Sequence, residues 1–361
     1  MVRAPHGRYH PRTLPGTEPS EGTTSAFRGA RPRTLRVPVV VGAPVPLRRR
    51  LKDLRRAILY QAVFRPLIAV LLRVPRVLMR AFLGTVVVPA FHLITRRKSF
   101  RHLDKVYGPT RATTWKRRTA YRVTRNFVTG MGEAIEALRR GPDRIDVNLD
   151  DRDARALVAR LEAGSARGFI ALTGHVGNWE LLGSWFARTS TRGAGAAIAK
   201  RNPNPHLNAR FEQFRRQLGL ETLYREDPPT APIRVLRSGR SLAVVPDQDV
   251  KNLAGIFVEF LGHSAYTPLG PARIALAADV PIVCGFLLRR DDGSRWIAVS
   301  EPIVPDRSAP RAEEIERLTR AWSAEVESII RAYPDQWAWF HERWRTTPER
   351  LARLGRRELE L

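Results

Sequence analysis

The chain of 361 residues has a single cysteine, Cys284. One cysteine excludes a disulfide framework within the chain and a cysteine-rich zinc site. Because Cys284 lies inside an apolar segment, residues 281–288, we interpret it as packed core rather than as a nucleophile. Acidic residues are also few: 35 Asp and Glu stand against 62 Lys and Arg, a net charge of +27. The 43% of hydrophobic residues excludes a wholly disordered protein.

The shortage of acidic residues is confined to the N-terminal third. Residues 1–125 contain 28 Lys and Arg and only 4 Asp and Glu, a net charge of +24, whereas residues 126–361 carry +3. An excess spread over the whole chain would be typical of a nucleic-acid-binding protein. A basic segment on a nearly neutral domain fits contact with anionic membrane lipid better, and we expect no nucleic-acid partner. Nucleic-acid binding through this segment stays the alternative, although few aromatic residues are interleaved with its arginines.

No uncharged apolar run reaches the ~20 residues that a membrane-spanning helix requires. Four arginines interrupt the apolar segment that follows residue 56: Arg65, Arg73, Arg76 and Arg80. Its longest uncharged run, residues 81–95, has 15 residues. We therefore predict basic amphipathic helices that lie in the membrane interface. A true span and a core helix hairpin with a basic outer face are the alternatives.

Composition divides the chain into three parts. Residues 1–47, rich in Pro, Gly and Arg, are predicted to form a disordered basic arm. Residues 48–112 would form the membrane-associated helices, and residues 113–361 a folded domain. In that domain apolar segments alternate with amphipathic ones, which predicts an α/β fold with a mixed, largely parallel sheet flanked by helices. The predicted strands are residues 168–174, 196–199, 220–224, 241–246, 256–260, 281–288 and 296–300; the predicted helices are residues 113–139, 151–163, 178–188, 205–218, 230–238, 270–278 and 311–332.

A histidine follows the first apolar strand of the domain, where sites collect in α/β folds. His175 lies in the predicted strand-to-helix turn, and Glu180 lies in the first turns of the helix. If His175 folds back over the helix, Glu180 can accept a hydrogen bond from one ring nitrogen and leave the other as a base. The amide of Gly177 and the helix N-terminus would favour developing negative charge. A hydrogen-bonded structural histidine is the alternative.

The chain has no G-x-S-x-G segment that would supply a serine nucleophile, so a catalytic His175 would activate a hydroxyl of the substrate. The string LTGHVGNWE, residues 172–180, resembles the H-x4-D/E motif of the lysophospholipid acyltransferase superfamily. Its glutamate version is typical of the bacterial lipid A biosynthesis (lauroyl/myristoyl) acyltransferases and of the mycobacterial phosphatidylinositol mannoside acyltransferases. Three later segments resemble further blocks of that family in order: KRNPNPHLN (200–208), VVPDQDV (244–250) with the stretch after it, and DQWAWFHERWRTTP (335–348).

The resemblance implies a glycerolipid-acyltransferase-like fold and an acyltransferase domain over residues 113–361. His175 would be the general base, and Glu180 would orient it. The donor would be a thioester of acyl carrier protein or coenzyme A, the acceptor a hydroxyl of a lipid or glycolipid, and no metal or other cofactor would be needed. The protein would act at the cytoplasmic face of the bacterial inner membrane, where its basic segment contacts anionic lipid.

Five other residues are candidates for substrate binding. Asn178 would position substrate or cap the helix. Lys200 and Arg201 suit a phosphate or a developing oxyanion, or they are a solvated basic pair. Asp247 and Gln248 follow a strand and so face the same sheet edge as His175, where they would bind the acceptor, support the catalytic residues or cap a turn.

Two features bear on the acceptor and on rival functions. The domain lacks the P-E-G-T block of the glycerolipid branch, which favours a glycolipid acceptor over lysophosphatidate. The terminal His341 and Arg343 are interpreted as structural. A catalytically silent lipid-binding member of the family and a hydrolase that uses water in place of the acceptor stay as alternatives.

Overall fold

The computed structural model of the chain describes residues 73–140, 149–193, 195–250 and 253–353, together with Ile58, Gln61, Ala62, Pro66 and Val70. The predicted basic arm, residues 1–47, and much of the segment before residue 73 lie outside the described residues. The chain divides into two units, Met1–Pro46 and Leu47–Leu361, and all described residues belong to the second.

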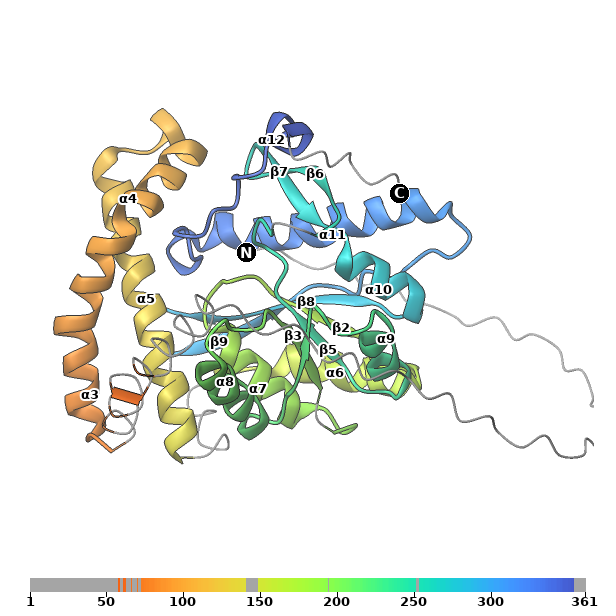
Figure 1. Cartoon of the computed structure of the whole chain (residues 1–361), viewed down its shortest axis with the longest axis horizontal. Coiled ribbons are helices and arrows are strands. Elements are labelled where there is room, and N and C mark those ends of the chain that lie inside the picture. Colours follow the sequence, from red (N-terminus) through yellow and green to blue (C-terminus); the bar gives the residue numbers. More distant parts are fainter. Residues whose placement is uncertain are drawn as a thin grey trace, which may run out of the picture. The chain divides into compact units, whose positions relative to one another are not determined.

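A seven-stranded sheet forms the centre of this unit, in the order β1-β9-β8-β2-β5-β3-β4 (Figure 1). The strands are β1 (Leu149–Asp150), β2 (Ile170–Leu172), β3 (Ala196–Ala199), β4 (Glu221–Tyr224), β5 (Leu242–Val244), β8 (Ile282–Arg289) and β9 (Arg295–Val299). All neighbours pair in parallel except β8 and β9, which are antiparallel. The predicted mixed, largely parallel sheet is therefore confirmed.

Helices cover both faces of the sheet because its strands alternate between two apolar clusters. Ile170 and Leu172 of β2 pack with α10 (Gly270–Ala278) and α11 (Arg311–Ala332). The other face, with Val283 and Leu287 of β8, packs with α6 (Arg152–Gly164) and α7 (Trp179–Thr189). Figure 1 shows α11 and α7 on opposite sides of the sheet. Both faces of the central strands are thus covered, as expected for parallel strands.

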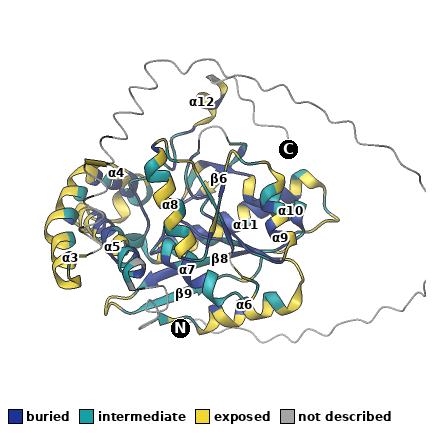
Figure 2. Ribbon diagram, turned by 60° about the horizontal axis from the view of Figure 1, so that its bottom comes forward, coloured by how far each residue is buried: buried dark blue, intermediate teal, exposed yellow. Residues whose placement is uncertain are grey.

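A helical layer precedes the sheet. It consists of α3 (Arg76–Phe82), the π-helical turn η2 (Leu83–Val87), α4 (Val88–Tyr107), the short η3 (Gly108–Thr110) and α5 (Thr113–Arg140). Helix α4 packs along α5, whose Ala120 and Val123 reach the main core. The helical run Arg76–Thr110 is long and apolar enough to cross a membrane, and only 17% of its most apolar window is buried. Figure 2 shows exposed residues along α3. The interfacial position expected for this segment stays a prediction.

One predicted strand does not belong to the main sheet. Residues 256–260 lie in β6 (Gly255–Phe260), which pairs antiparallel with an unpredicted strand, β7 (His263–Pro268). Leu261 and Gly262, with φ of 54° and 77°, make the tight turn between them. Successive positive φ values are typical of a two-residue hairpin turn.

The remaining elements connect the strands and close the chain. They are α8 (Pro205–Gln217), α9 (Thr230–Arg237), η5 (Pro334–Gln336) and α12 (Pro348–Arg353). After α11 the chain returns over the turn that follows β2: Val176 and Trp337 form an antiparallel bridge, and the Ala338 amide donates to the His175 carbonyl at 3.0 Å. The C-terminal block therefore lies against the predicted catalytic turn.

Candidate active site

The turn between β2 and α7 is fixed by its contact with β8. Gly177 has a φ of +61°, and a Cβ placed there would lie 2.0 Å from the carbonyl oxygen of Leu287. Only glycine suits a left-handed backbone at so close an approach. The next amide, of Asn178, donates to that same carbonyl at 3.0 Å. Gly177 therefore determines the direction in which the backbone leaves His175.

Asp247 is the carboxylate that holds His175. Strands β2 and β5 are parallel neighbours in the register Leu172 to Val244, so the residues that follow them meet at one sheet edge. Asp247 Oδ1 lies 2.6 Å from His175 Nδ1, and Oδ2 accepts from the His175 amide at 2.7 Å and from Trp337 Nε1 at 2.9 Å. The Asp247 side chain is fully buried, with 0% exposure. It is thus enclosed behind the imidazole and does not line the cavity.

The protonation of this pair follows from its donors. Burial alone would raise the pKa of Asp247, but the charge of the His175 ring and the hydrogen bonds from His175 and Trp337 outweigh it, so the pKa lies well below its usual range. An ionised carboxylate only accepts hydrogen bonds, so Nδ1 of His175 carries a proton. In the neutral ring Nε2 then carries the free lone pair, the form that a general base requires. The Gln248 amide nitrogen lies 2.9 Å from His175 Nε2 and 3.2 Å from Nδ1, so it lies over the ring and leaves that lone pair open.

Two rings flank His175. The Trp179 and His341 rings lie edge-on to it, with centroids at 4.9 Å and 4.7 Å. Burial, and next the charge of His175, lowers the pKa of His341 to about 4, so His341 is neutral at neutral pH. Its buried Nε2 has no hydrogen-bond partner among the described residues. His175 therefore lies between two uncharged rings.

An aromatic cluster joins these rings to the helical layer. Phe127 of α5 stacks on Phe91 of α4 at 5.4 Å and on Trp179 at 5.9 Å. Phe340 contacts both phenylalanines at 5.4 Å and 5.2 Å and then His341 at 4.9 Å. Two routes of touching rings thus run from α4 to His175.

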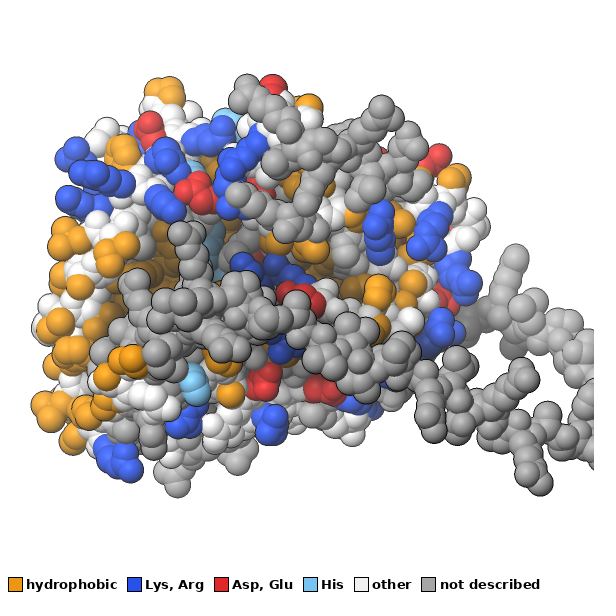
Figure 3. Space-filling model, in the orientation of Figure 1, with side chains coloured by type: hydrophobic (Ala, Val, Ile, Leu, Met, Phe, Trp, Pro, Cys, Tyr) orange, Lys and Arg blue, Asp and Glu red, His pale blue; other side chains and the backbone are white. Residues whose placement is uncertain are grey.

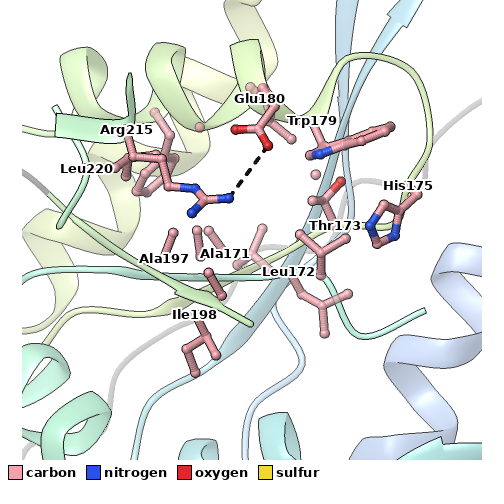
Figure 4. A pocket seen from close by; sticks show the side chains of 18 of the residues that line it. Ala171, Leu172, Thr173, His175, Trp179, Glu180, Ala197, Ile198, Arg215 and Leu220 are labelled. Atoms are coloured by element: carbon pink, nitrogen blue, oxygen red, sulfur yellow. Dashed lines mark ion pairs between the residues drawn. The ribbon is translucent and has the colours of Figure 1, made fainter. Parts of the chain in front are cut away.

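Glu180 does not contact His175 in the described structure. It lines the same cavity, but its carboxylate points to Arg215 of α8, with 3.9 Å between Oε1 and Nη2 (Figure 4). The expectation of a hydrogen bond between His175 and Glu180 is wrong, because the ring is already turned toward Asp247 of the neighbouring strand. Two amides expected to favour negative charge are also engaged: Gly177 N donates to Gln336 O at 2.8 Å and Asn178 N to Leu287 O.

The other predicted residues separate into lining and supporting positions. The side-chain oxygen of Asn178 caps α7 by accepting from the Leu181 amide at 3.2 Å, so the capping alternative holds. The side-chain NH2 group of Asn178 donates to Glu133 of α5 at 3.0 Å. Lys200 and Gln248 line the cavity. Arg201 instead lays its guanidinium over the Tyr224 ring at 3.7 Å.

The cavity beside His175 has a volume of about 940 Å³ and is divided by polarity. One part, which we call the mouth, is lined by the charged side chains Glu180, Lys200, Arg215, Arg225, Glu226, Asp249 and Arg345. Its other part, which we call the apolar arm, runs between the sheet and helices α6 and α7. None of the described residues that line this arm is charged. Its lining residues are Ala154, Leu157, Val158, Leu161, Phe169, Ala171, Leu182, Trp185, Phe186, Val283, Gly285, Ile297 and Val299.

Small side chains on the strands leave this space open. Ala171 of β2 pairs in register with Ala243 of β5 and with Val283 of β8, and Ala197 of β3 pairs with Ala243. The middle residues of β2 and β5, Ala171 and Ala243, keep partial exposure although their neighbours along each strand are buried. A space therefore remains between α7 and this part of the sheet.

No group of three or more His, Cys, Asp or Glu able to hold a metal ion occurs among the described residues.

Sequence reasoning missed three contributors. Trp337 donates to Asp247, and Arg215 and Arg225 join Lys200 at the mouth. The likeness of residues 335–348 to the family's C-terminal block was the one available signal for Trp337. Nothing in the local sequence distinguished Arg215 from other arginines of an amphipathic helix.

Comparison with known proteins agrees with these observations. The model of the bacterial lipid A biosynthesis acyltransferase family matches residues 48–346. A phosphatidylinositol mannoside acyltransferase of Mycolicibacterium smegmatis is 28% identical over 221 residues, which are 59% of this chain and 68% of that protein. Its namesake in Mycobacterium tuberculosis H37Rv is 28% identical over 57% of this chain and 62% of its own. The lipid A biosynthesis lauroyltransferase of Escherichia coli K12 is 27% identical over 43% of this chain and 50% of its own.

Proposed function

Since the chain belongs to the bacterial lipid A biosynthesis acyltransferase family, and is thus an acyltransferase of lipid biosynthesis, we propose that it moves a fatty acyl chain from a thioester to a hydroxyl of a membrane glycolipid. One observation carries the proposal: a His175–Asp247 pair stands where a charged mouth meets an apolar arm. A thioester donor has this same division, with a polar carrier on one side of the reacting carbonyl and an alkyl chain on the other.

His175 is the general base of the proposed reaction. Nε2 takes the proton of the acceptor hydroxyl while the oxygen attacks the thioester carbonyl. Asp247 holds Nδ1–H at 2.6 Å and stabilises the imidazolium that forms. When the tetrahedral intermediate collapses, the C–S bond breaks and the proton on Nε2 passes to the departing thiolate. The hydroxyl oxygen keeps the acyl group as an ester, and His175 returns to its neutral form.

Gln248 lies beside the position proposed for the acceptor. Its amide nitrogen is 2.9 Å from His175 Nε2 and 3.2 Å from Nδ1, so it lies over the ring and leaves the lone pair of Nε2 open to an attacking hydroxyl. In this proposal the Gln248 amide binds a second hydroxyl of the sugar.

Cations at the mouth suit the phosphates of an acyl carrier protein's prosthetic group or of coenzyme A. Lys200, Arg215 and Arg225 line it together, and burial lowers the pKa of Arg225 without discharging a guanidinium. Glu180 pairs with Arg215 at 3.9 Å and so fixes the position of one cation. Glu180 acts in this proposal on substrate binding as well as on the electrostatics around His175.

The helical layer is the proposed membrane contact, at the cytoplasmic face of the inner membrane. Val77 and Ile94 are 76% and 77% exposed on its apolar surface. Exposed cations follow on α4: Arg96, Arg97, Lys98 and Arg101. Figure 3 shows hydrophobic side chains along this edge of the molecule, with Lys and Arg gathered beyond one end. Apolar and basic surfaces of this kind bind anionic bilayers, and each surface cation contributes about 1 kcal/mol.

Lipid mass spectrometry tests the proposal. The full chain is incubated with acyl-CoA or acyl carrier protein thioesters and vesicles that contain a mannosylated phosphatidylinositol or a lipid A precursor. We expect one acceptor to gain the mass of one acyl chain, and His175→Ala to lower the rate at least about 10³-fold while the protein stays folded. Release of free fatty acid without acylated lipid would instead identify a hydrolase, and lipid binding without turnover a silent family member.

A further inference from the structure

A single glycine lines the route into one end of the apolar arm. That end, which we call the deep end, is lined by Leu157 and Val158 of α6 and by Ile297 of β9, and β9 lies two strands away from β2, the strand that His175 follows. Gly285 of β8 lies on the same sheet face as Val283 and Leu287, which pack with α6 and α7. It is the residue of β8 that stands across from Val299 of β9. The arm therefore passes over Gly285 on its way to the α6 and β9 side.

The surroundings of Gly285 are open enough for a side chain. A Cβ built there would have as its nearest atoms Leu182 Cδ2 at 3.9 Å, Ala298 O at 4.0 Å and Val299 Cγ1 at 4.0 Å. Its φ is not in the left-handed region, so an L-residue fits the backbone without strain. Gly285 also keeps partial exposure between the buried Cys284 and Phe286. Neither the backbone conformation nor close packing requires glycine at position 285. The absence of a side chain there leaves space open in the apolar arm.

Gly285 also lies close to the reacting groups. Register places Leu172 of β2 beside Cys284, so Gly285 is level with the start of the turn that carries His175. That turn is fixed to β8 two residues further on, where Asn178 N donates to Leu287 O at 3.0 Å. An alkyl chain whose carbonyl is held at His175 and whose end lies between α6 and β9 has to pass between Leu182, Val299 and Gly285.

We propose that Gly285 determines acyl-chain specificity: its missing side chain admits long chains to the deep end of the arm, and a larger side chain there lowers the affinity for long chains in proportion to its size. This inference rests on the proposed function for the acyl-transfer reaction. The expected effect of Gly285 on thioester binding does not depend on that reaction. Each methylene buried in an apolar site favours binding about four-fold. A side chain that excludes three methylenes would therefore weaken a long acyl donor about 60-fold relative to a short one.

The experiment compares Gly285→Ala and Gly285→Val with the unchanged protein. Gly270 supplies the matched control, because it begins α10, does not line the cavity, and has nothing within 4 Å of a built Cβ. The double variant Gly285→Val/Leu182→Ala removes bulk from the opposite wall. For each protein, binding of acyl-coenzyme A thioesters from butyryl to palmitoyl is measured by calorimetry without acceptor, and kcat/KM is measured with acceptor lipid.

We expect the affinity of the unchanged protein and of Gly270→Val to rise with chain length. In Gly285→Val the rise stops early: palmitoyl binding falls about 60-fold relative to butyryl binding, and Leu182→Ala in the same chain restores at least about tenfold. Restoration by a second cavity-forming change would not follow from a merely unstable fold. If valine prevents folding, alanine decides, with an expected fall of several-fold confined to the longest chains.

A chain-length profile in Gly285→Val and Gly285→Ala equal to that of the unchanged protein would overturn the inference. Because binding is measured without acceptor, this result is separate from a failure of the proposed function. A protein that binds long thioesters in the expected pattern but transfers no acyl group would refute the transfer reaction and still support the role of Gly285.

Discussion

Replacing Asp247 by Asn should remove the general base while leaving the fold in place. The carboxylate accepts three N–H groups: the His175 amide and Trp337 Nε1 at Oδ2, and His175 Nδ1 at Oδ1. Asparagine has one side-chain oxygen. It would accept from the two donors whose positions are fixed, the His175 backbone amide and the buried Trp337 indole. Its NH2 group would then face Nδ1 and force that nitrogen to accept. The proton would move to Nε2, and the nitrogen that should take the hydroxyl proton would be occupied.

The size of the effect follows from this loss of tautomer. In a serine-protease triad the same change lowers kcat about 10⁴-fold. Because a thioester is more reactive than an amide and demands less of the base, we expect a loss of about 10³- to 10⁴-fold in kcat for Asp247→Asn, or about 4–5 kcal/mol in activation free energy. The matched control is Glu180→Gln. Glu180 is 34% exposed, and among the described residues its carboxylate pairs with Arg215 at 3.9 Å. Solvent-accessible pairs contribute up to about 1 kcal/mol, so the loss in Glu180→Gln should stay below about tenfold.

The assay is steady-state transfer from an acyl thioester to lipid, followed by thiol release and by mass spectrometry of the product. Circular dichroism melts verify that both variants fold. A thousandfold loss in Glu180→Gln together with near-normal turnover in Asp247→Asn would refute the assignment of the orienting carboxylate to Asp247, and it would favour the sequence expectation in which Glu180 orients the base.

Two further predictions concern stability and membrane contact. Because the pKa of His341 is lowered from 6.5 to about 4 in the fold, the unfolded chain binds more protons between these values, and stability is lost as pH falls through them. Urea unfolding should show the wild type losing about 2 kcal/mol between about pH 7.5 and pH 5, and His341→Gln should lack that part of the loss; equal slopes would contradict it. The double change Leu93→Asp/Ile94→Asp, at positions 64% and 77% exposed, should weaken co-sedimentation with anionic vesicles at least about tenfold, whereas Val304→Asp, 63% exposed and outside the helical layer, should not.

The secondary structure was largely predictable because apolar periodicity is a local property. The helix expected at residues 178–188 is α7 (Trp179–Thr189), and the one expected at residues 311–332 is α11 with identical bounds. The unpredicted β7 (His263–Pro268) shows the limit. Its sequence HSAYTP has few large apolar residues and ends in proline, so only its pairing with β6 identifies it as a strand.

The position of the candidate site was predictable, but the partner of His175 was not. His175 could be found because it follows a buried strand directly. Asp247 was correctly placed at the same edge, but its role depends on β5 pairing with β2, whereas the next strand in the chain, β3, pairs elsewhere. Strand order is a long-range property that no local pattern contains. The hydrogen bond from Trp337, 90 residues beyond Asp247, is unpredictable for the same reason.

The aromatic cluster has a consequence for any attempt to shorten this protein. Phe127 of the helical layer packs on Trp179, and Phe91 and Phe127 pack on Phe340, which contacts His341. The α7 cap also depends on that layer, through the bond from Asn178 to Glu133. A truncated chain that began at Leu149 would lose the exposed apolar surface of α3 and α4, and with it one side of the enclosure of His175. The helices proposed to contact the membrane are therefore also part of the scaffold that positions His175.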